Sequence, residues 1–345
     1  MIETSKWSSS MIGEAFPIEV LEDRITPVAN ITEQLAVIAA GQTHAPAYAV
    51  AAGPGANPVV NAYNARGTLL YSIQVFNSSF RGGVHVALGD VLGNGYNDII
   101  VAPASSGPPN VRVFDGISGQ LVESYFAYTP TFTGGVSLAA SDLYGNGYAD
   151  VITGAGPGGG PHVEVFDGRS AQLIQSYYAF SPTFTFGVTV TAGNFFGNGQ
   201  SEVAVGLGTG GPPIINFFSG TSGQFLTGFY AFSPAYLGGV NLASTDLLAT
   251  GHDELIYSTN ADTSLVVAVD LVANRFVSLF FAYPSSYTTG IQVAGFVPTI
   301  GGRGEIVTCS GPGTTPLLEF FTVPNNQLGS FFPFEASFLG GGFVG

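Results

Sequence analysis

The sequence predicts an all-β protein, a six-bladed β-propeller built from four-stranded antiparallel blades. Two observations carry this prediction: a pattern that returns about every 52 residues, and four short strand-like segments within each period. A regular period of this length with turn residues at fixed offsets is typical of propellers and other repeat architectures. The chain has 345 residues, which is enough for six such units with a substantial core.

A glycine followed by Val or Ile marks the start of each period. These glycines follow one another at spacings of 52, 52, 52 and 51 residues: Gly83, Gly135, Gly187, Gly239 and Gly290. The second unit then reads as four strands, "VHVALGD", "DIIVAP", "NVRVFDG" and "QLVESYFAY", separated by turns rich in Gly, Pro and Asn. A two-sheet sandwich explains the strands but not the period, and an open β-solenoid usually has shorter rungs.

Six units account for nearly all of the chain, so we expect a single propeller domain over residues 31–345. Residues 1–30 form an N-terminal arm outside the repeat. The first unit matches the repeat only in part, and "LAVIAAG" is expected to supply its first strand. The C-terminal "GGGFVG" starts a partial seventh repeat, which either closes the ring within the chain or pairs with another copy.

Each fourth strand ends in a pair of aromatic residues. Rings in the same column of every unit are expected to fill the gaps between neighbouring sheets. The pairs are Tyr125–Phe126, Tyr177–Tyr178, Phe229–Tyr230, Phe280–Phe281 and Phe331–Phe332.

Composition excludes several classes of function. The net charge is −15 and there is a single lysine, which argues against nucleic acid and anionic membranes as partners, because both require basic patches. No run of 18 apolar residues occurs, so no membrane-spanning helix is expected. The four histidines fall at unrelated repeat positions and no nucleophile–base constellation stands out. We therefore expect no shared histidine site and no enzymatic activity.

The repeat can be compared with a known family. Units of the form "FxGGVxVAxGDxxGxGxxDIIxGxGPGGGPxVxVFDGxxGQ" resemble the FG-GAP/VCBS-type repeats of bacterial surface propellers, especially those of planctomycete proteins. The segment "VLEDRITP", residues 20–27, is similar to the "LEDRxxP" segment near the N-terminus of many such proteins. The resemblance implies a cell-surface or extracellular location and calcium sites in the blade loops, with no uniform activity.

In the resembled repeat, loop positions 1, 3, 5 and 9 supply side-chain oxygens to Ca²⁺ and position 7 supplies a carbonyl, as a hard cation requires. The second unit offers Asp90, Asn94, the Tyr96 carbonyl and Asp98. Leu92 occupies position 3, so one ligand is lost.

The third unit offers an equivalent set, Asp142, Asn146, the Tyr148 carbonyl and Asp150, with Tyr144 at position 3. Ca²⁺ in these two loops is the one cofactor that the sequence suggests, but the missing ligand at position 3 weakens both sites. The alternative is a structural turn in which Asp and Asn bind nearby backbone amides. Later units keep fewer candidate ligands: Asn194, Asn198 and Glu202, then Asp246, Thr250 and Glu254, then Glu305.

The favoured function is a non-enzymatic extracellular or cell-surface propeller that self-associates as a structural subunit of a filament, tube or surface layer. The first alternative is a carbohydrate-binding or adhesion module that recognises surface glycans, which exposed tyrosines on one face would favour. The second is a hydrolase or lyase built on a propeller. A glycosidase needs two carboxylates about 5–10 Å apart in a cleft, so an acid cluster lining the central channel would favour it.

Overall fold

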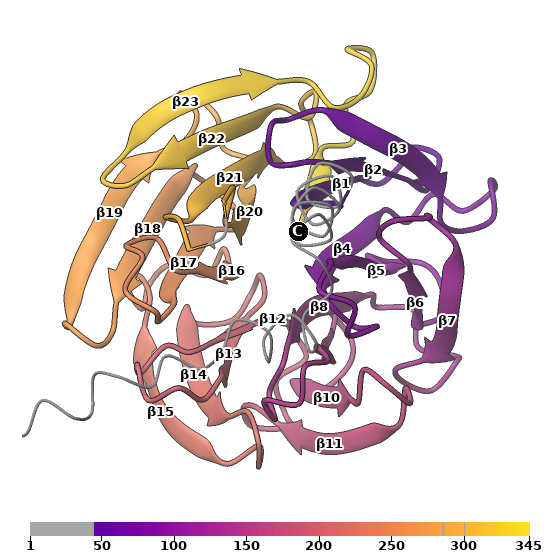
Figure 1. Ribbon diagram of the computed structural model, residues 1–345. Helices are drawn as coiled ribbons and strands as arrows, with labels where there is room; N and C mark the ends of the chain where they lie inside the picture. Colours follow the sequence, from indigo (N-terminus) through magenta and orange to yellow (C-terminus); the bar gives the residue numbers. More distant parts are fainter. Residues whose placement is uncertain (1–44, 285, 300) are drawn as a thin grey trace, which may run out of the picture. The chain divides into compact units, whose positions relative to one another are not determined.

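The structure is a computed structural model that describes residues 45–345, apart from residues 285 and 300. The described residues lie in the compact unit His44–Gly345 and form six four-stranded antiparallel sheets around a ring (Figure 1). The predicted all-β, six-bladed propeller is confirmed. No helix in the described residues is long and apolar enough to cross a membrane.

Every blade has the same order of strands from the centre outwards. The inner strands are β4 (Val84–Gly89), β8 (Val136–Ser141), β12 (Val188–Gly193), β16 (Val240–Thr245), β20 (Ile291–Phe296) and β24 (Gly342–Val344). The second strands are β1 (Tyr48–Ala52), β5 (Asp98–Pro103), β9 (Asp150–Ala155), β13 (Glu202–Leu207), β17 (Glu254–Thr259) and β21 (Glu305–Ser310).

The third strands are β2 (Val59–Tyr63), β6 (Asn110–Phe114), β10 (His162–Phe166), β14 (Ile214–Ser219), β18 (Leu265–Asp270) and β22 (Leu318–Thr322). The outer strands are β3 (Leu69–Gln74), β7 (Leu121–Phe126), β11 (Leu173–Tyr178), β15 (Phe225–Tyr230), β19 (Arg275–Phe281) and β23 (Asn326–Phe331). We number the blades by their outer strands, so that the first contains β3 and the sixth contains β23.

The first blade combines strands from both ends of the described chain. Its inner strand is β24, which pairs antiparallel with β1 in a register that places Val50 opposite Val344. Ala49 and Gly345 exchange two backbone hydrogen bonds of 2.8 and 3.1 Å. The sequence analysis gave this inner place to "LAVIAA", but β24 occupies it. Residues 35–40 lie outside the described residues, as do the N-terminal arm and its boundary at residue 30.

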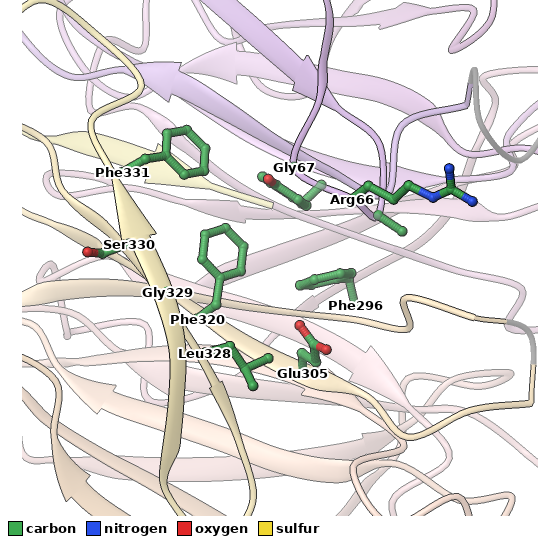
Figure 2. Close-up of a pocket in the computed structure, with 11 residues that line it drawn as sticks. Arg66, Gly67, Phe296, Glu305, Phe320, Leu328, Gly329, Ser330 and Phe331 are labelled. Carbon is green, nitrogen blue, oxygen red and sulfur yellow. The ribbon is translucent and has the colours of Figure 1, made fainter.

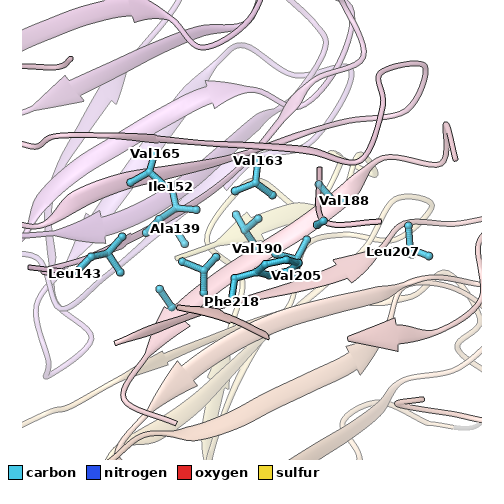
Figure 3. Packing of buried hydrophobic residues seen from close by; sticks show 13 residues of the cluster. Ala139, Leu143, Ile152, Val163, Val165, Val188, Val190, Val205, Leu207 and Phe218 are labelled. Carbon is cyan, nitrogen blue, oxygen red and sulfur yellow. The ribbon is translucent and has the colours of Figure 1, made fainter. Parts of the chain in front are cut away.

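The hydrophobic core is divided among the six gaps between neighbouring blades. Each gap holds one cluster of buried side chains from both blades, and Figure 3 shows the cluster between the third and fourth blades. There Ile152 and Val165 of one blade meet Val190 and Val205 of the next. The second strands β5, β9, β13 and β17 are buried along their whole length, because blades pack against both of their faces.

Steric contact between blades explains the glycine column. Gly135 has φ of 91°, a conformation that L residues rarely adopt, and a Cβ added there would lie 1.9 Å from the carbonyl oxygen of Ala104 in the preceding blade. Gly290 has φ of 74° and the same relation to Asn260, at 2.1 Å. Only glycine at the position before the inner strand therefore lets the preceding blade pack this closely.

Candidate functional site

The loops predicted to bind calcium are held by hydrogen bonds from their own backbone. In the second blade the two carboxylate oxygens of Asp90 accept N–H groups from Asn94 at 2.9 Å and Gly95 at 2.7 Å. The side-chain oxygen of Asn94 accepts the N–H of Tyr96 at 2.9 Å. This is the geometry of the structural turn, in which short polar side chains satisfy nearby amides.

Asp98 closes the same loop from inside the protein. It is fully buried at the start of β5, and its two oxygens accept the N–H of Leu92 at 2.9 Å and that of Gly116 at 3.1 Å. Gly116 belongs to the turn between the third and outer strands. One carboxylate thus ties together two turns of the blade that are separate in sequence.

The third blade repeats this arrangement. Asp142 accepts the amides of Asn146 and Gly147 at 3.0 and 2.8 Å, and the side chain of Asn146 accepts the amide of Tyr148 at 3.0 Å. Asp150, fully buried, accepts N–H groups from Leu143 at 3.2 Å and Gly168 at 3.4 Å. All the side chains named in the calcium prediction therefore lie together in two loops. Calcium binding there stays a prediction, in competition with these backbone amides.

Burial raises the pKa of these two carboxyl groups. It raises the pKa of Asp98 to about 6, against the lowering effect of the N–H groups of Leu92 and Gly116, while nearby Asp115 and Asp90 raise it further. The same causes raise the pKa of Asp150 to about 6. Both groups are thus ionised at neutral pH at a free-energy cost to the folded state.

The fifth blade contains a side-chain group that the sequence analysis did not assemble. His252, Glu254 and Asp270 place one ligand-capable atom each within 4.8 Å of the other two. Glu254 was counted as a remnant of the loop, whereas His252 was set aside because the histidines do not share a repeat position. A histidine two residues before the loop carboxylate was the available signal; Asp270, at the end of β18, is brought close only by the fold.

The central channel is lined by side chains of the six inner strands, which are mostly small or aliphatic at one level and include His85, Asn241 and Gln292 at another. Among them are Ala87, Leu138, Thr191, Ala243 and Val293. No Asp or Glu is among the described residues that line the channel. The acid cluster that would favour a glycosidase is thus not formed by the described channel residues.

A cavity with a volume of about 450 Å³ lies between the first and sixth blades (Figure 2). Phe296, Phe320 and Phe331 line it from the sixth blade, and Arg66 approaches from the turn between β2 and β3. The Glu305 carboxylate also faces this space, and burial raises its pKa.

A buried hydroxyl adds to the polar groups of this cavity. The hydroxyl oxygen of Tyr48 is buried and has no hydrogen-bond partner among the described residues. Burial, together with the nearby Tyr63 and Glu305, raises the pKa of Tyr48, so the phenol stays neutral. A cavity of a few hundred Å³ with aromatic walls and a few polar groups is typical of sites for small ligands.

The outer strands expose apolar side chains on every blade. The aromatic pairs divide: Tyr125 packs on Phe166 of the next blade, with ring centroids 4.7 Å apart, whereas Phe126 is 49% exposed. The expectation of gap-filling rings is therefore confirmed for the first residue of that pair and wrong for the second. Exposed apolar residues on these strands include Leu69, Leu121, Val122, Leu173, Ile174, Tyr178, Phe225, Leu226, Tyr230, Phe276, Leu279, Phe281 and Leu328.

A β-bulge recurs in all six outer strands. The register between the third and outer strands shifts by one residue at the same place in each blade, and the unpaired residue is always aliphatic. The bulged residues are Leu70, Val122, Ile174, Leu226, Val277 and Leu328. The six outer strands contain only two charged side chains, Glu123 and Arg275.

Comparison with known proteins supports the fold and no further assignment. No family model and no curated protein matches the sequence. Among solved structures, Raptor of Chaetomium thermophilum is similar with a TM-score of 0.52 and 12% identity, over 84% of this chain and 24% of that one.

Two further structures have lower scores. The Dos1 propeller has a TM-score of 0.44 at 14% identity, over 81% of this chain and 66% of that one. The rhamnogalacturonan lyase YesW has a TM-score of 0.41 at 14% identity, over 82% of this chain and 55% of that one. The chain thus spans between 24% and 66% of the length of these three proteins. At such identities the likeness shows the fold alone.

The buried loop carboxylates predict that mild acid stabilises the protein. Between pH 4 and 6 a folded state whose carboxyl pKa values lie near 6 holds protons that the unfolded chain has released, so its stability is lost as pH rises through this range. We expect the midpoint of urea unfolding to be higher at pH 5 than at pH 7. In the double variant Asp98→Asn/Asp150→Asn the increase should be smaller.

The matched control for this experiment is Asp90→Asn/Asp142→Asn, which removes two carboxylates from the exposed part of the same loops. It should keep most of the increase between pH 7 and pH 5, because burial is the largest cause of the raised pKa of Asp98 and Asp150, and Asp90 and Asp142 are the smallest. An unfolding midpoint that falls on acidification, or an increase that is the same in both double variants, would contradict the account.

Proposed function

We propose that this protein is a non-enzymatic propeller that self-associates, as a structural subunit of an extracellular or cell-surface assembly such as a filament, tube or surface layer. The observation that carries the proposal is the belt of exposed apolar side chains on the six outer strands, which we call the outer belt. Exposed apolar patches on a folded protein mark sites of association.

The chemistry of the outer belt favours a second copy of the chain as its partner. Natural edge strands are usually protected by lysines, prolines or inward-pointing charges, but these outer strands carry almost no charge and each has one edge unpaired in the described structure. The same surface is repeated around the ring. Another copy would present an equivalent repeated surface, so contacts could form in several directions.

The resemblance to FG-GAP/VCBS-type repeats is part of the same proposal. The "GNG" loops and the "LEDRITP" segment support an FG-GAP/VCBS-type repeat protein of the planctomycete cell-surface kind, and this resemblance is the basis for placing the protein outside the cell. Calcium in the loops of Asp90/Asp98 and Asp142/Asp150 would fit such a setting. The net charge of −15 and the scarcity of lysine support the view that nucleic acid is not a partner.

Self-association can be tested with lysines at the bulges of the outer belt. Val122, Ile174 and Leu226 are the unpaired residues of three neighbouring bulges and are 42%, 39% and 46% exposed. We expect the native protein to form species that are multiples of 35.5 kDa at micromolar concentration, measured by light scattering. The triple variant Val122→Lys/Ile174→Lys/Leu226→Lys should shift the mass towards the monomer.

A control with the same change in charge places three lysines in exposed turns, as Ile117→Lys/Leu237→Lys/Leu339→Lys. These side chains are 43%, 53% and 57% exposed and lie outside the outer strands. The control should assemble like the native protein. A native protein that is monomeric at all concentrations, or a bulge variant that assembles unchanged, would refute the proposal.

The cavity between the first and sixth blades favours a second function, a carbohydrate-binding or adhesion module. Its phenylalanine rings offer faces on which a sugar ring can stack, and Arg66 and Glu305 can orient sugar hydroxyls. A hydrolase or lyase is the weaker alternative, because Glu305 is the one carboxylate among the described lining residues and a glycosidase normally needs two.

Ligand binding in this cavity can be measured by calorimetry with a panel of neutral and acidic oligosaccharides. If a glycan is the ligand, the double variant Arg66→Ala/Glu305→Gln should bind at least about tenfold more weakly, because two charge-assisted hydrogen bonds are lost. The exposed Arg81, outside the cavity, gives the control Arg81→Ala. Binding that the double variant leaves unchanged, or no binding of any panel member, would count against this second function.

A further inference from the structure

The loop at the start of β17 carries the most unusual side-chain cluster of the described structure. His252 lies at loop position 7, where the second and third blades have Tyr96 and Tyr148, and Glu254 follows at position 9. The Nε2 atom of His252 lies 3.3 Å from the Oδ1 atom of Asp270 and 3.8 Å from the Oε1 atom of Glu254. Three atoms that can bind a metal ion, from three positions in the chain, therefore lie within 4.8 Å of one another.

Glu254 provides an observation that points to a ligand. Its side chain is fully buried, and its Oε1 atom has no hydrogen-bond partner in the described structure. A buried carboxylate oxygen without a partner is costly, and the usual solutions are a hydrogen-bond donor or a metal ion. Oε1 lies 3.8 Å from the Nε2 atom of His252, so this unpartnered acceptor is directed into the cluster.

The other polar atoms of the three residues are already held in place. The Nδ1 atom of His252 lies 3.0 Å from the hydroxyl of Thr250, so Nε2 is the ring nitrogen that faces the cluster, where its hydrogen-bond partner is Oδ1 of Asp270 at 3.3 Å. The Oε2 atom of Glu254 accepts the N–H of Leu247 at 2.7 Å. The Oδ2 atom of Asp270 accepts from the Nε atom of Arg275 at 3.2 Å, and its Oδ1 atom accepts the N–H of Ala273 at 2.8 Å. Such outer hydrogen bonds orient the ligands of metal sites and fix the histidine tautomer.

The donor set decides the kind of ion. One imidazole nitrogen with two carboxylate oxygens suits Zn²⁺ and related transition metals, whereas Ca²⁺ and Mg²⁺ prefer oxygen ligands throughout. Ligand bonds of about 2.0–2.2 Å in a tetrahedral site place the donors roughly 3.3 Å apart, so small side-chain movements from the present 3.3 and 3.8 Å would suffice. His252 is partly exposed, with 14% of its side chain accessible, which leaves an entry path.

We propose that His252, Glu254 and Asp270 form a site for a divalent transition-metal ion of the Zn²⁺ class, with three protein ligands and a fourth position for water. The site differs from the predicted calcium loops in its donor atoms and in its use of Asp270, the last residue of β18, just before the turn to β19. It ties the loop before β17 to that turn, so the bound ion would stabilise the fifth blade.

The test is a calorimetric titration of Zn²⁺ into the tag-free full-length protein after treatment with a chelator. We expect one ion per chain and a rise in melting temperature on saturation, because the ion binds the folded state. The variant His252→Tyr should bind at least 100-fold more weakly. Tyrosine is the residue at this loop position in two other blades, so this variant should fold. Glu254→Gln keeps the shape of the buried side chain and should weaken binding as well.

The control is His162→Ala. His162 and Glu164 have the same separation of 3.8 Å, without a third His, Cys, Asp or Glu close by in the described structure. This variant should bind Zn²⁺ like the native protein. Native protein that takes up no Zn²⁺, a His252→Tyr variant with unchanged affinity, or equal loss of binding in His162→Ala would overturn the proposal. Ca²⁺ binding that competes fully with Zn²⁺ and survives His252→Tyr would do the same.

Discussion

The architecture of four of the six blades, the second to the fifth, depends on a buried carboxylate at the start of the second strand. An ionised group in the interior is stable only where hydrogen bonds replace its lost hydration. Asp98 meets this condition in part by accepting amides from two separate turns, and Asp150 repeats it; the hydration that is not replaced raises the pKa of both groups. Glu202 accepts the N–H of Phe195 and the side-chain amide of Asn198, and Glu254 accepts the N–H of Leu247. The sixth blade departs from this pattern, because the Glu305 carboxylate faces the cavity beside the first blade.

We expect functional sites at two kinds of place: where one blade differs from the others, and where apolar side chains are exposed and do not contribute to the core. The blades share one core design, with apolar side chains in every gap, and one outer design, with aliphatic bulges and exposed rings. The shared outer belt suits repeated contacts with identical partners. The cavity beside Tyr48 and Glu305 and the cluster of His252, Glu254 and Asp270 instead fit the small ligands proposed above, because both lie where a blade differs from its neighbours in the described structure.

Much of the fold could be predicted from the sequence because steric constraints recur in every blade. The glycine column is visible as a period since any side chain at Gly135 would overlap the preceding blade. The inner strand of the first blade was assigned wrongly because "LAVIAA" and the C-terminal "GFV" both have strand character, and only ring closure distinguishes them. The cluster of His252 with Asp270 could not be found by spacing, because one residue lies in the loop before β17 and the other at the end of β18. The exposure of Phe126 likewise depends on which side of the outer strand meets a neighbouring blade.

The most direct test of this account is the free energy of unfolding in urea at pH 7 for Asp98→Ala and Asp90→Ala, measured with chelator present. Removal of the Asp98 carboxylate leaves two N–H groups, of Leu92 and Gly116, without acceptors in the interior. We predict a loss of about 2–4 kcal/mol for this variant. Asp90→Ala, whose partners Asn94 and Gly95 can bind water instead, should lose no more than about 1 kcal/mol. Equal losses in the two variants, or a larger loss for Asp90→Ala, would contradict the claim that the buried carboxylate holds the blade together.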